Sequence, residues 1–235
     1  MTNTIDILAI GAHPDDVEIG MAGTLALHQQ QGYKTAICAL TKAELSSNGT
    51  VESRQDEAEK AAALIGATER IQLDFPDRGL AEEREAITEL TRIIRRYKPT
   101  YVFVPWHEDR HPDHGACGRI SYEAVFNAKI RNYKPEAGDA HSVAHCFYYM
   151  INSSAKPHFV LNVSEVYETK RAALSAYQSQ FSPGPAGVET PLTNQYVAAV
   201  EARDRKWGSE AGVTYAEGFI SDRPLPLNHL GGLQL

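Results

Sequence analysis

An α/β fold, built on a mostly parallel sheet with helices on both faces, is the architecture that the sequence predicts. Short apolar runs alternate with longer segments of helical periodicity over residues 5–129, which is typical of strands joined by crossover helices. The runs at 5–12 and 101–105 are almost continuously hydrophobic, as expected of strands that are buried on both faces. No linker or internal repeat divides the chain, so we expect a single domain over residues 1–235.

The pattern assigns each element in turn. The first strands are expected at 5–12, 33–40, 70–75 and 100–106, and the helices that follow them at 17–30, 51–66, 82–98 and 114–129. Further strands are expected at 145–151 and 158–164, helices at 165–180 and 192–210, a Pro/Gly loop at 181–191 and a short apolar segment at 213–220. We therefore expect a Rossmann-like core over residues 1–140 and a C-terminal extension over 141–235 that completes the site.

Composition excludes several classes of protein. The 235 residues carry 30 acidic and 23 basic side chains, a balance that argues against nucleic acid as the main partner. Every apolar run is far shorter than the roughly 18 residues that a membrane helix needs, and the first residues do not resemble a signal peptide. The 3 cysteines are widely spaced, which argues against a disulfide framework or a thiolate zinc site and predicts a reducing cytoplasm.

Two polar clusters follow predicted strands directly. Residues 13–16 read His-Pro-Asp-Asp, and residues 107–114 read His-Glu-Asp-Arg-His-Pro-Asp-His. In a sheet of order 3-2-1-4-5, the order reverses between the first and fourth strands, which are the two that carry these clusters. Ligands of open parallel sheets bind at such a reversal, outside the carboxyl ends of the strands. The two clusters are therefore expected to meet in one crevice.

Imidazole and carboxylate ligands without a thiolate suit zinc, with iron or another divalent metal as alternatives. His13, Asp16 and His114 form the expected ligand set, and Asp15 is expected to act as a base toward the attacking water. Taken singly, each residue is explained as well by a turn or a helix cap. The sequence contains no Walker loop, no dinucleotide-binding glycine motif and no nucleophile elbow.

The motifs AHPDDVEIG at 12–20 and HPDH at 111–114 resemble those of the LmbE-like, or PIG-L, family of zinc-dependent de-N-acetylases. Segments such as SSNGT at 46–50 and YAEGF at 215–219 are similar to the subgroup that deacetylates N-acetylglucosaminyl L-malate in bacillithiol biosynthesis. The resemblance extends in order over nearly the whole chain. It implies a single LmbE-like deacetylase domain and a small anionic N-acetyl sugar conjugate as substrate, and it suggests a homo-oligomer such as a hexamer.

The resemblance also implies roles for individual residues. It supports the three metal ligands already named and makes Asp15 the general base and later the acid. His111 would be a second catalytic group that donates to the oxyanion, and Asp113 would orient an imidazole, with that of His111 expected.

Four residues are candidates for contact with the substrate. Arg54 and Arg110 could bind the malate carboxylates, since guanidinium binds carboxylate in a bidentate fork. Asn48 could touch sugar hydroxyls, and Tyr196 is expected to reach the site. Each has a structural alternative: a surface pair with Glu57 for Arg54, a solvated loop charge for Arg110, a turn for Asn48 and helix packing for Tyr196.

Two other functions remain open from the sequence. The chain could deacetylate a different N-acetylglucosamine conjugate, such as a chitobiose, an inositol conjugate or a thiol adduct. It could instead be a non-catalytic binding module whose polar clusters only hold metal or cap helices. Asp15 favours an enzyme, because a purely structural metal site does not need a free base beside its ligands.

Overall fold

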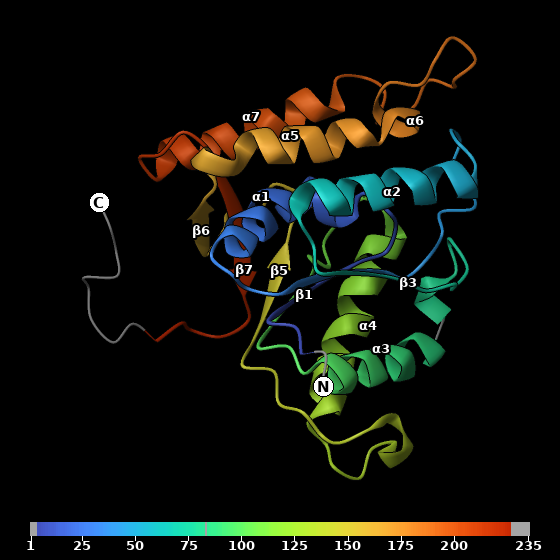
Figure 1. The fold of residues 1–235 in the computed structure, drawn as a ribbon, viewed down its shortest axis with the longest axis vertical. Helices are drawn as coiled ribbons and strands as arrows, with labels where there is room; N and C mark the ends of the chain where they lie inside the picture. Colours follow the sequence, from blue (N-terminus) through green and yellow to red (C-terminus); the bar gives the residue numbers. More distant parts are fainter. Residues whose placement is uncertain (1–3, 83, 227–235) are drawn as a thin grey trace.

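The computed structural model describes residues 4–82 and 84–226. Its described strands form one seven-stranded sheet of order β3-β2-β1-β4-β5-β7-β6 (Figure 1). The strands are β1 (Ile7–Gly11), β2 (Thr35–Ala39), β3 (Glu69–Gln72), β4 (Tyr101–Pro105), β5 (His145–Tyr149), β6 (Phe159–Asn162) and β7 (Ala216–Ser221). The first five are parallel and follow the order 3-2-1-4-5, so the expected mostly parallel sheet is confirmed.

Helices cover both faces of this sheet. They are α1 (Asp16–Gln30), α2 (Val51–Ile65), α3 (Arg84–Tyr97), α4 (Pro112–Ala128), α5 (Tyr167–Ala176), α6 (Gln178–Phe181) and α7 (Tyr196–Glu210). In Figure 1, α1 and α2 lie on one side of the sheet and α3 and α4 on the other. Helix α5 packs across α1 and α2, which makes a further layer on that side, and α7 packs on β7. One buried apolar cluster fills each side of the sheet, and all three cysteines are buried and unpaired.

The C-terminal extension completes the sheet. The apolar segment expected at 213–220 forms strand β7, which inserts between β5 and β6 and runs antiparallel to both. The chain reaches this position because the segment after β6 first crosses the face of α1 and α2 as helices and then returns along α7. The extension therefore contributes strands to the same sheet as the core.

Two predicted helices differ in extent from those observed. The helix expected over 165–180 is interrupted, because Tyr177 leaves helical geometry with ψ near 60° and its buried hydroxyl donates to Glu18. The helix expected over 192–210 begins only at Tyr196, after Gln195 adopts a positive φ of 53°. Both changes occur beside the polar end of the sheet, where they shape one wall of the pocket described below.

A buried ionic network joins the extension to helix α1. The Lys170 ammonium lies 2.7 Å from a carboxylate oxygen of Asp204 and 2.7 Å from one of Glu217, and all three side chains are fully buried. Glu217 also accepts the backbone N–H groups of Gly23 and Thr24, which are free to donate outward because α1 kinks just before them. The network thus fixes α1, whose first turn carries site residues, to the C-terminal part of the chain.

No helix within the described ranges is long and apolar enough to cross a membrane.

Candidate active site

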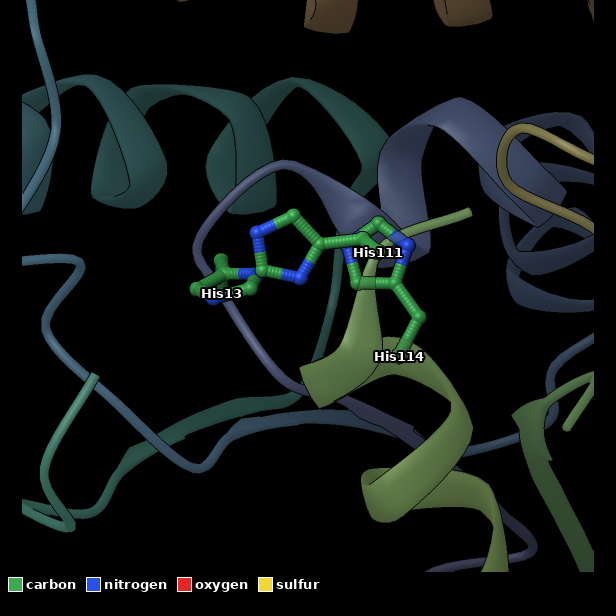
Figure 2. Close-up of side chains that lie close together, drawn as sticks. All are labelled: His13, His111 and His114. Atoms are coloured by element: carbon green, nitrogen blue, oxygen red, sulfur yellow. The ribbon is translucent and has the colours of Figure 1, made fainter. Parts of the chain in front are cut away.

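The two polar clusters meet at the carboxyl ends of β1 and β4, as expected. These strands are hydrogen-bonded neighbours in parallel register, so the loops that leave them lie side by side. Figure 2 shows three imidazole rings gathered there, with His13 from the loop between β1 and α1 and His111 and His114 from the start of α4. One ring nitrogen from each of the three histidines lies within 4.8 Å of those from the other two. The predicted crevice is therefore present.

Asp16 lies between two of these rings. Its Oδ1 is 3.1 Å from His114 Nε2, and its Oδ2 is 3.5 Å from His13 Nδ1. Its Oδ2 also accepts the backbone N–H of His13 at 2.8 Å, which fixes the carboxylate at the start of α1. The three ligands predicted from the sequence are thus brought together by the fold.

Each of the two histidines has a carboxylate on its other ring nitrogen. His114 Nδ1 lies 3.0 Å from Asp109 Oδ1, and His13 Nε2 lies 3.2 Å from Asp77 Oδ1. Such a carboxylate fixes the tautomer and leaves the remaining nitrogen free to bind a metal. Burial lowers the pKa of His114, but Asp16 and the hydrogen bond to Asp109 outweigh it and raise that pKa to about 9. The surroundings favour positive charge, so the donor set fits a divalent cation.

His111 offers a further nitrogen to the same space. It is the N-cap of α4, and its Nδ1 accepts the backbone N–H of Asp113 at 3.3 Å. That bond places the hydrogen of a neutral ring on Nε2. Burial, together with the neighbouring His114 and His13, lowers the pKa of His111 below its ordinary value.

The expected contact between Asp113 and the ring of His111 is not observed. One carboxylate oxygen of Asp113 accepts the backbone N–H of Arg78 at 2.6 Å and lies 3.7 Å from His13 Nε2. The reason is geometric: Asp113 lies in the first turn of α4, where its side chain turns toward the β1 loop while its N–H is used by the cap. Asp113 therefore faces His13 and not the ring of His111, whose neutral form carries its hydrogen on Nε2.

Asp15 has an uncommon backbone conformation. It is the N-cap of α1 with φ 105°, a region that residues other than glycine seldom adopt, and its side chain makes no capping hydrogen bond. Strained conformations of this kind cluster at functional sites. The helix-capping alternative weighed from the sequence is therefore wrong for this residue, and its carboxylate remains available to the pocket.

Arg54 faces Asp15 and not open solvent. Its Nη2 donates to Asp15 Oδ2 at 3.0 Å and to the Pro14 carbonyl, and its Nη1 donates to Ser46 Oγ at 3.0 Å. Burial raises the pKa of Asp15 to about 6, although the Arg54 charge opposes that rise. The alternative weighed for Arg54, a surface pair with Glu57, is not observed, because Glu57 accepts hydrogen bonds from Ser179.

The other expected substrate contacts have varied surroundings. Asn48 spends its side-chain amide on the loop residue Val188, donating to its carbonyl at 2.8 Å and accepting its N–H at 2.7 Å. Arg110 is exposed and donates to Asn152 Oδ1 at 3.1 Å. The hydroxyl of Tyr196 donates to the same oxygen at 2.9 Å, so the tyrosine reaches the site.

The candidate site is a pocket of about 460 Å³. Its floor holds the histidine cluster with Asp15 and Asp16, and its wall includes Thr190, Pro191 and Leu192 from the loop before α7. All of the predicted site residues line it except Asp113, which is buried behind His13. A cavity of this size with a few convergent polar groups suits a small-molecule substrate.

Sequence reasoning missed four residues that build this site: Asp77, Arg78, Asp109 and Asn152. Asp109 and the Asp77-Arg78 pair lie in polar loops after predicted strands, which was a signal that could have found them. Arg78 lines the pocket with a half-exposed side chain. Asn152 is a lone amide after an apolar run, and nothing in the sequence distinguishes it.

Comparison with known proteins identifies the family to which this fold and this site belong. Residues 8–125 match the model of the family described as "PIG-L: GlcNAc-PI de-N-acetylase", and the chain belongs to this family of deacetylases. The expected family membership is confirmed.

Individual relatives agree with this placement. The chain is 32% identical over 228 residues to the diacetylchitobiose deacetylase of Thermococcus kodakarensis, a match that covers 91% of this chain and 81% of the relative. It is 30% identical over 191 residues to a probable N-acetyl-alpha-D-glucosaminyl L-malate deacetylase 2 of Bacillus cereus, covering 74% and 83% of the two chains. The solved structure of the conserved protein TT1542 from Thermus thermophilus superposes with a TM-score of 0.86 at 38% identity, covering 95% of this chain and 97% of the other.

Proposed function

We propose that this protein hydrolyses the N-acetyl group of an anionic N-acetylglucosamine conjugate, with N-acetylglucosaminyl L-malate as the candidate substrate and zinc or another divalent cation as cofactor. The observation that carries the proposal is that the Asp15 carboxylate, which makes no capping hydrogen bond to α1, lies in the same pocket as the Asp16 and His114 pair. A general base beside a cation site is what amide hydrolysis by an activated water requires.

His13, Asp16 and His114 would hold the cation, which when bound supplies Lewis acidity toward water and the acetyl carbonyl. Asp15 accepts the proton of the attacking water and returns it to the leaving glucosamine nitrogen. His111 donates from Nε2 to the carbonyl oxygen as negative charge develops there, since its Nδ1 is occupied by the Asp113 N–H. Removal of such a donor typically costs about 100- to 1000-fold in rate.

The arginines of the pocket support an anionic substrate. Arg54 is buried and bonded to Asp15, so it acts on the base and leaves the substrate to other cations. Arg110 is exposed and Arg78 is half-exposed, and both line the same pocket as the histidine cluster. Acidic residues outnumber basic ones in this protein, 30 to 23, yet two guanidinium groups line this pocket. They match in number the two carboxylates of malate.

Diacetylchitobiose is a second candidate substrate. It is favoured by the match to the Thermococcus kodakarensis deacetylase, which covers more of this chain than does the match to the Bacillus cereus protein. A chitobiose carries no charge, so it does not use Arg78 or Arg110 as ion partners. The two candidates therefore differ in their dependence on the arginines at the mouth of the pocket.

Acetate release from N-acetylglucosaminyl L-malate, diacetylchitobiose and free N-acetylglucosamine tests the proposal with the zinc-loaded protein. We expect the malate conjugate to be hydrolysed fastest, Asp15→Asn to abolish release, and Arg110→Ala to raise KM for the malate conjugate about 10-fold, the equivalent of roughly 1.4 kcal/mol. Arg131→Ala is the matched control, because Arg131 is exposed outside the pocket. Faster hydrolysis of the chitobiose, with no effect of Arg110→Ala, would reject the malate assignment and favour the second candidate.

A further inference from the structure

Asp109 is surrounded by donors from three directions. Its Oδ1 accepts the His111 backbone N–H at 2.9 Å, the Asn152 side-chain amide at 3.0 Å and His114 Nδ1 at 3.0 Å. Its Oδ2 accepts the backbone N–H of Asn152 at 2.9 Å. The side chain is almost completely buried although the residue lies in a polar loop. A buried carboxylate with this many donors is held in one orientation, and it holds the His114 ring in turn.

Asn152 both donates and accepts hydrogen bonds at this position. Its main-chain and side-chain N–H groups both donate to Asp109, and its side-chain oxygen points the other way. There it accepts the Tyr196 hydroxyl at 2.9 Å and an Arg110 guanidinium N–H at 3.1 Å. An aspartate at this place would set a second carboxylate against Asp109, and an apolar residue would leave buried donors and acceptors unpaired.

The segment that carries Asn152 is itself held by helix α7. Arg203 donates from Nη1 to the carbonyls of Met150 and Ile151, at 3.0 and 2.9 Å, and from Nη2 to the Ile19 carbonyl of α1 at 2.9 Å. These bonds place the end of β5 at a fixed distance from α1, which begins with Asp16. The polar chain therefore runs without a break from the C-terminal extension to the metal-facing histidine.

From these contacts we propose that Asp109 and Asn152 are positioning residues that couple the substrate wall of the pocket to the metal site. Asp109 holds the hydrogen of His114 on Nδ1, so that Nε2 faces Asp16. Asn152 holds Asp109 on one side and sets the places of Tyr196 and Arg110 on the other. The inference rests on the proposed function only for its effect on turnover, since the effect on metal affinity does not require a substrate.

The affinity for Zn²⁺, measured by competition with a chromophoric chelator, tests the metal side. We expect Asp109→Asn to weaken binding about 10- to 100-fold, as is typical when the carboxylate partner of a metal-bound histidine is changed. Asn152→Ala should weaken Zn²⁺ binding by a smaller factor. The double variant should lose less affinity than the product of the two single losses, because both residues act through the ring of His114. Asp74→Asn, the same change at an exposed aspartate paired with Lys42, should bind like the unchanged protein.

Deacetylation kinetics test the substrate side. We expect Asn152→Ala to raise KM, since Tyr196 and Arg110 lose their shared acceptor, and also to lower kcat through His114. Asn152→Ser retains a polar side chain and gives a second variant if the alanine variant unfolds, which thermal melting would reveal. Folded variants of both residues with unchanged Zn²⁺ affinity would overturn the inference. Weakened Zn²⁺ binding in a protein that deacetylates no N-acetylglucosamine conjugate would instead support the positioning role and reject the proposed function.

Discussion

Replacement of Arg54 separates the role predicted from the sequence from the one that the structure indicates. Arg54 was expected to bind a carboxylate of the substrate, but its Nη2 lies 3.0 Å from Asp15 Oδ2 and both side chains are buried. In Arg54→Gln the charge that opposes the effect of burial on Asp15 is lost. The pKa of Asp15 should therefore rise further above its present value of about 6.

The size of the effect follows from the ionised fraction of the base. With a pKa of about 6, roughly nine-tenths of Asp15 is ionised at pH 7. A neighbouring opposite charge typically lowers a carboxyl pKa by about 1–3, so its removal leaves between about one half and about one hundredth ionised. Because the base must be ionised to accept a proton, kcat should fall by roughly 2- to 100-fold at a pH about one unit above the pKa of Asp15 in the unchanged protein, and it should recover as the pH rises. A bound cation lowers this pKa in both proteins, so the loss appears below pH 7 in the metal-loaded protein while the displacement between the two profiles remains.

The assay is kcat against pH for acetate release from the preferred substrate, with metal-loaded protein. The acidic limb of the Arg54→Gln profile should move to higher pH, while Arg54→Lys, which keeps the charge, should stay near the unchanged profile. If the kcat profiles of Arg54→Gln and the unchanged protein coincide along the pH axis and only KM is raised, this reasoning is refuted and Arg54 is restored as a substrate contact.

Three further predictions concern stability. Lys170→Met leaves the buried carboxylates of Asp204 and Glu217 without their shared cation; we expect a loss of about 3–5 kcal/mol in the free energy of unfolding, measured by urea denaturation, and a loss below about 1 kcal/mol would contradict it. Gly20→Ala places a Cβ 2.1 Å from the ring of Tyr149, so thermal melting should show destabilisation despite the gain in helix propensity of about 1 kcal/mol, and an unchanged Tm would show that β5 yields freely. Zn²⁺ at about 100 times its Kd should stabilise chelator-treated protein by about 2.7 kcal/mol, or roughly 5–10 °C in Tm, and no rise would argue against a bound metal.

The sequence predicts the part of the site that depends on strand order. Polar residues placed directly after two buried strands must meet if those strands are neighbours, and hydrophobic patterning is enough to place the strands. That is why His13, Asp16 and His114 could be brought together before any coordinates. The unusual φ of Asp15 and the use of the Asp113 carboxylate on His13 depend on the path of each loop within a few ångströms, which patterning does not determine.

Contacts between distant elements could not be predicted in the same way. The Arg54 guanidinium reaches Asp15 only because α2 packs with one particular face toward the β1 loop. The sequence offered a local partner, Glu57, at helical spacing, but Glu57 instead bonds Ser179 of α6, across the interface between α2 and the extension. Local spacing identifies which side chains are near each other along one helix, whereas the choice among charged partners is made by tertiary packing.

The division between core and extension bears on how such a chain acquires its specificity. The family model covers residues 8–125, which include the candidate metal ligands and the base. Asn152, Tyr196 and the loop residues Thr190 to Leu192 lie beyond it, yet they line the same pocket. We expect the groups at the ends of β1 and β4 to supply the chemistry common to the family. Recognition of a conjugate would combine Arg78 and Arg110, which lie within residues 8–125, with the wall that the extension builds. The relatives named above carry different substrates in their names, and we expect these arginines together with that wall to distinguish such substrates.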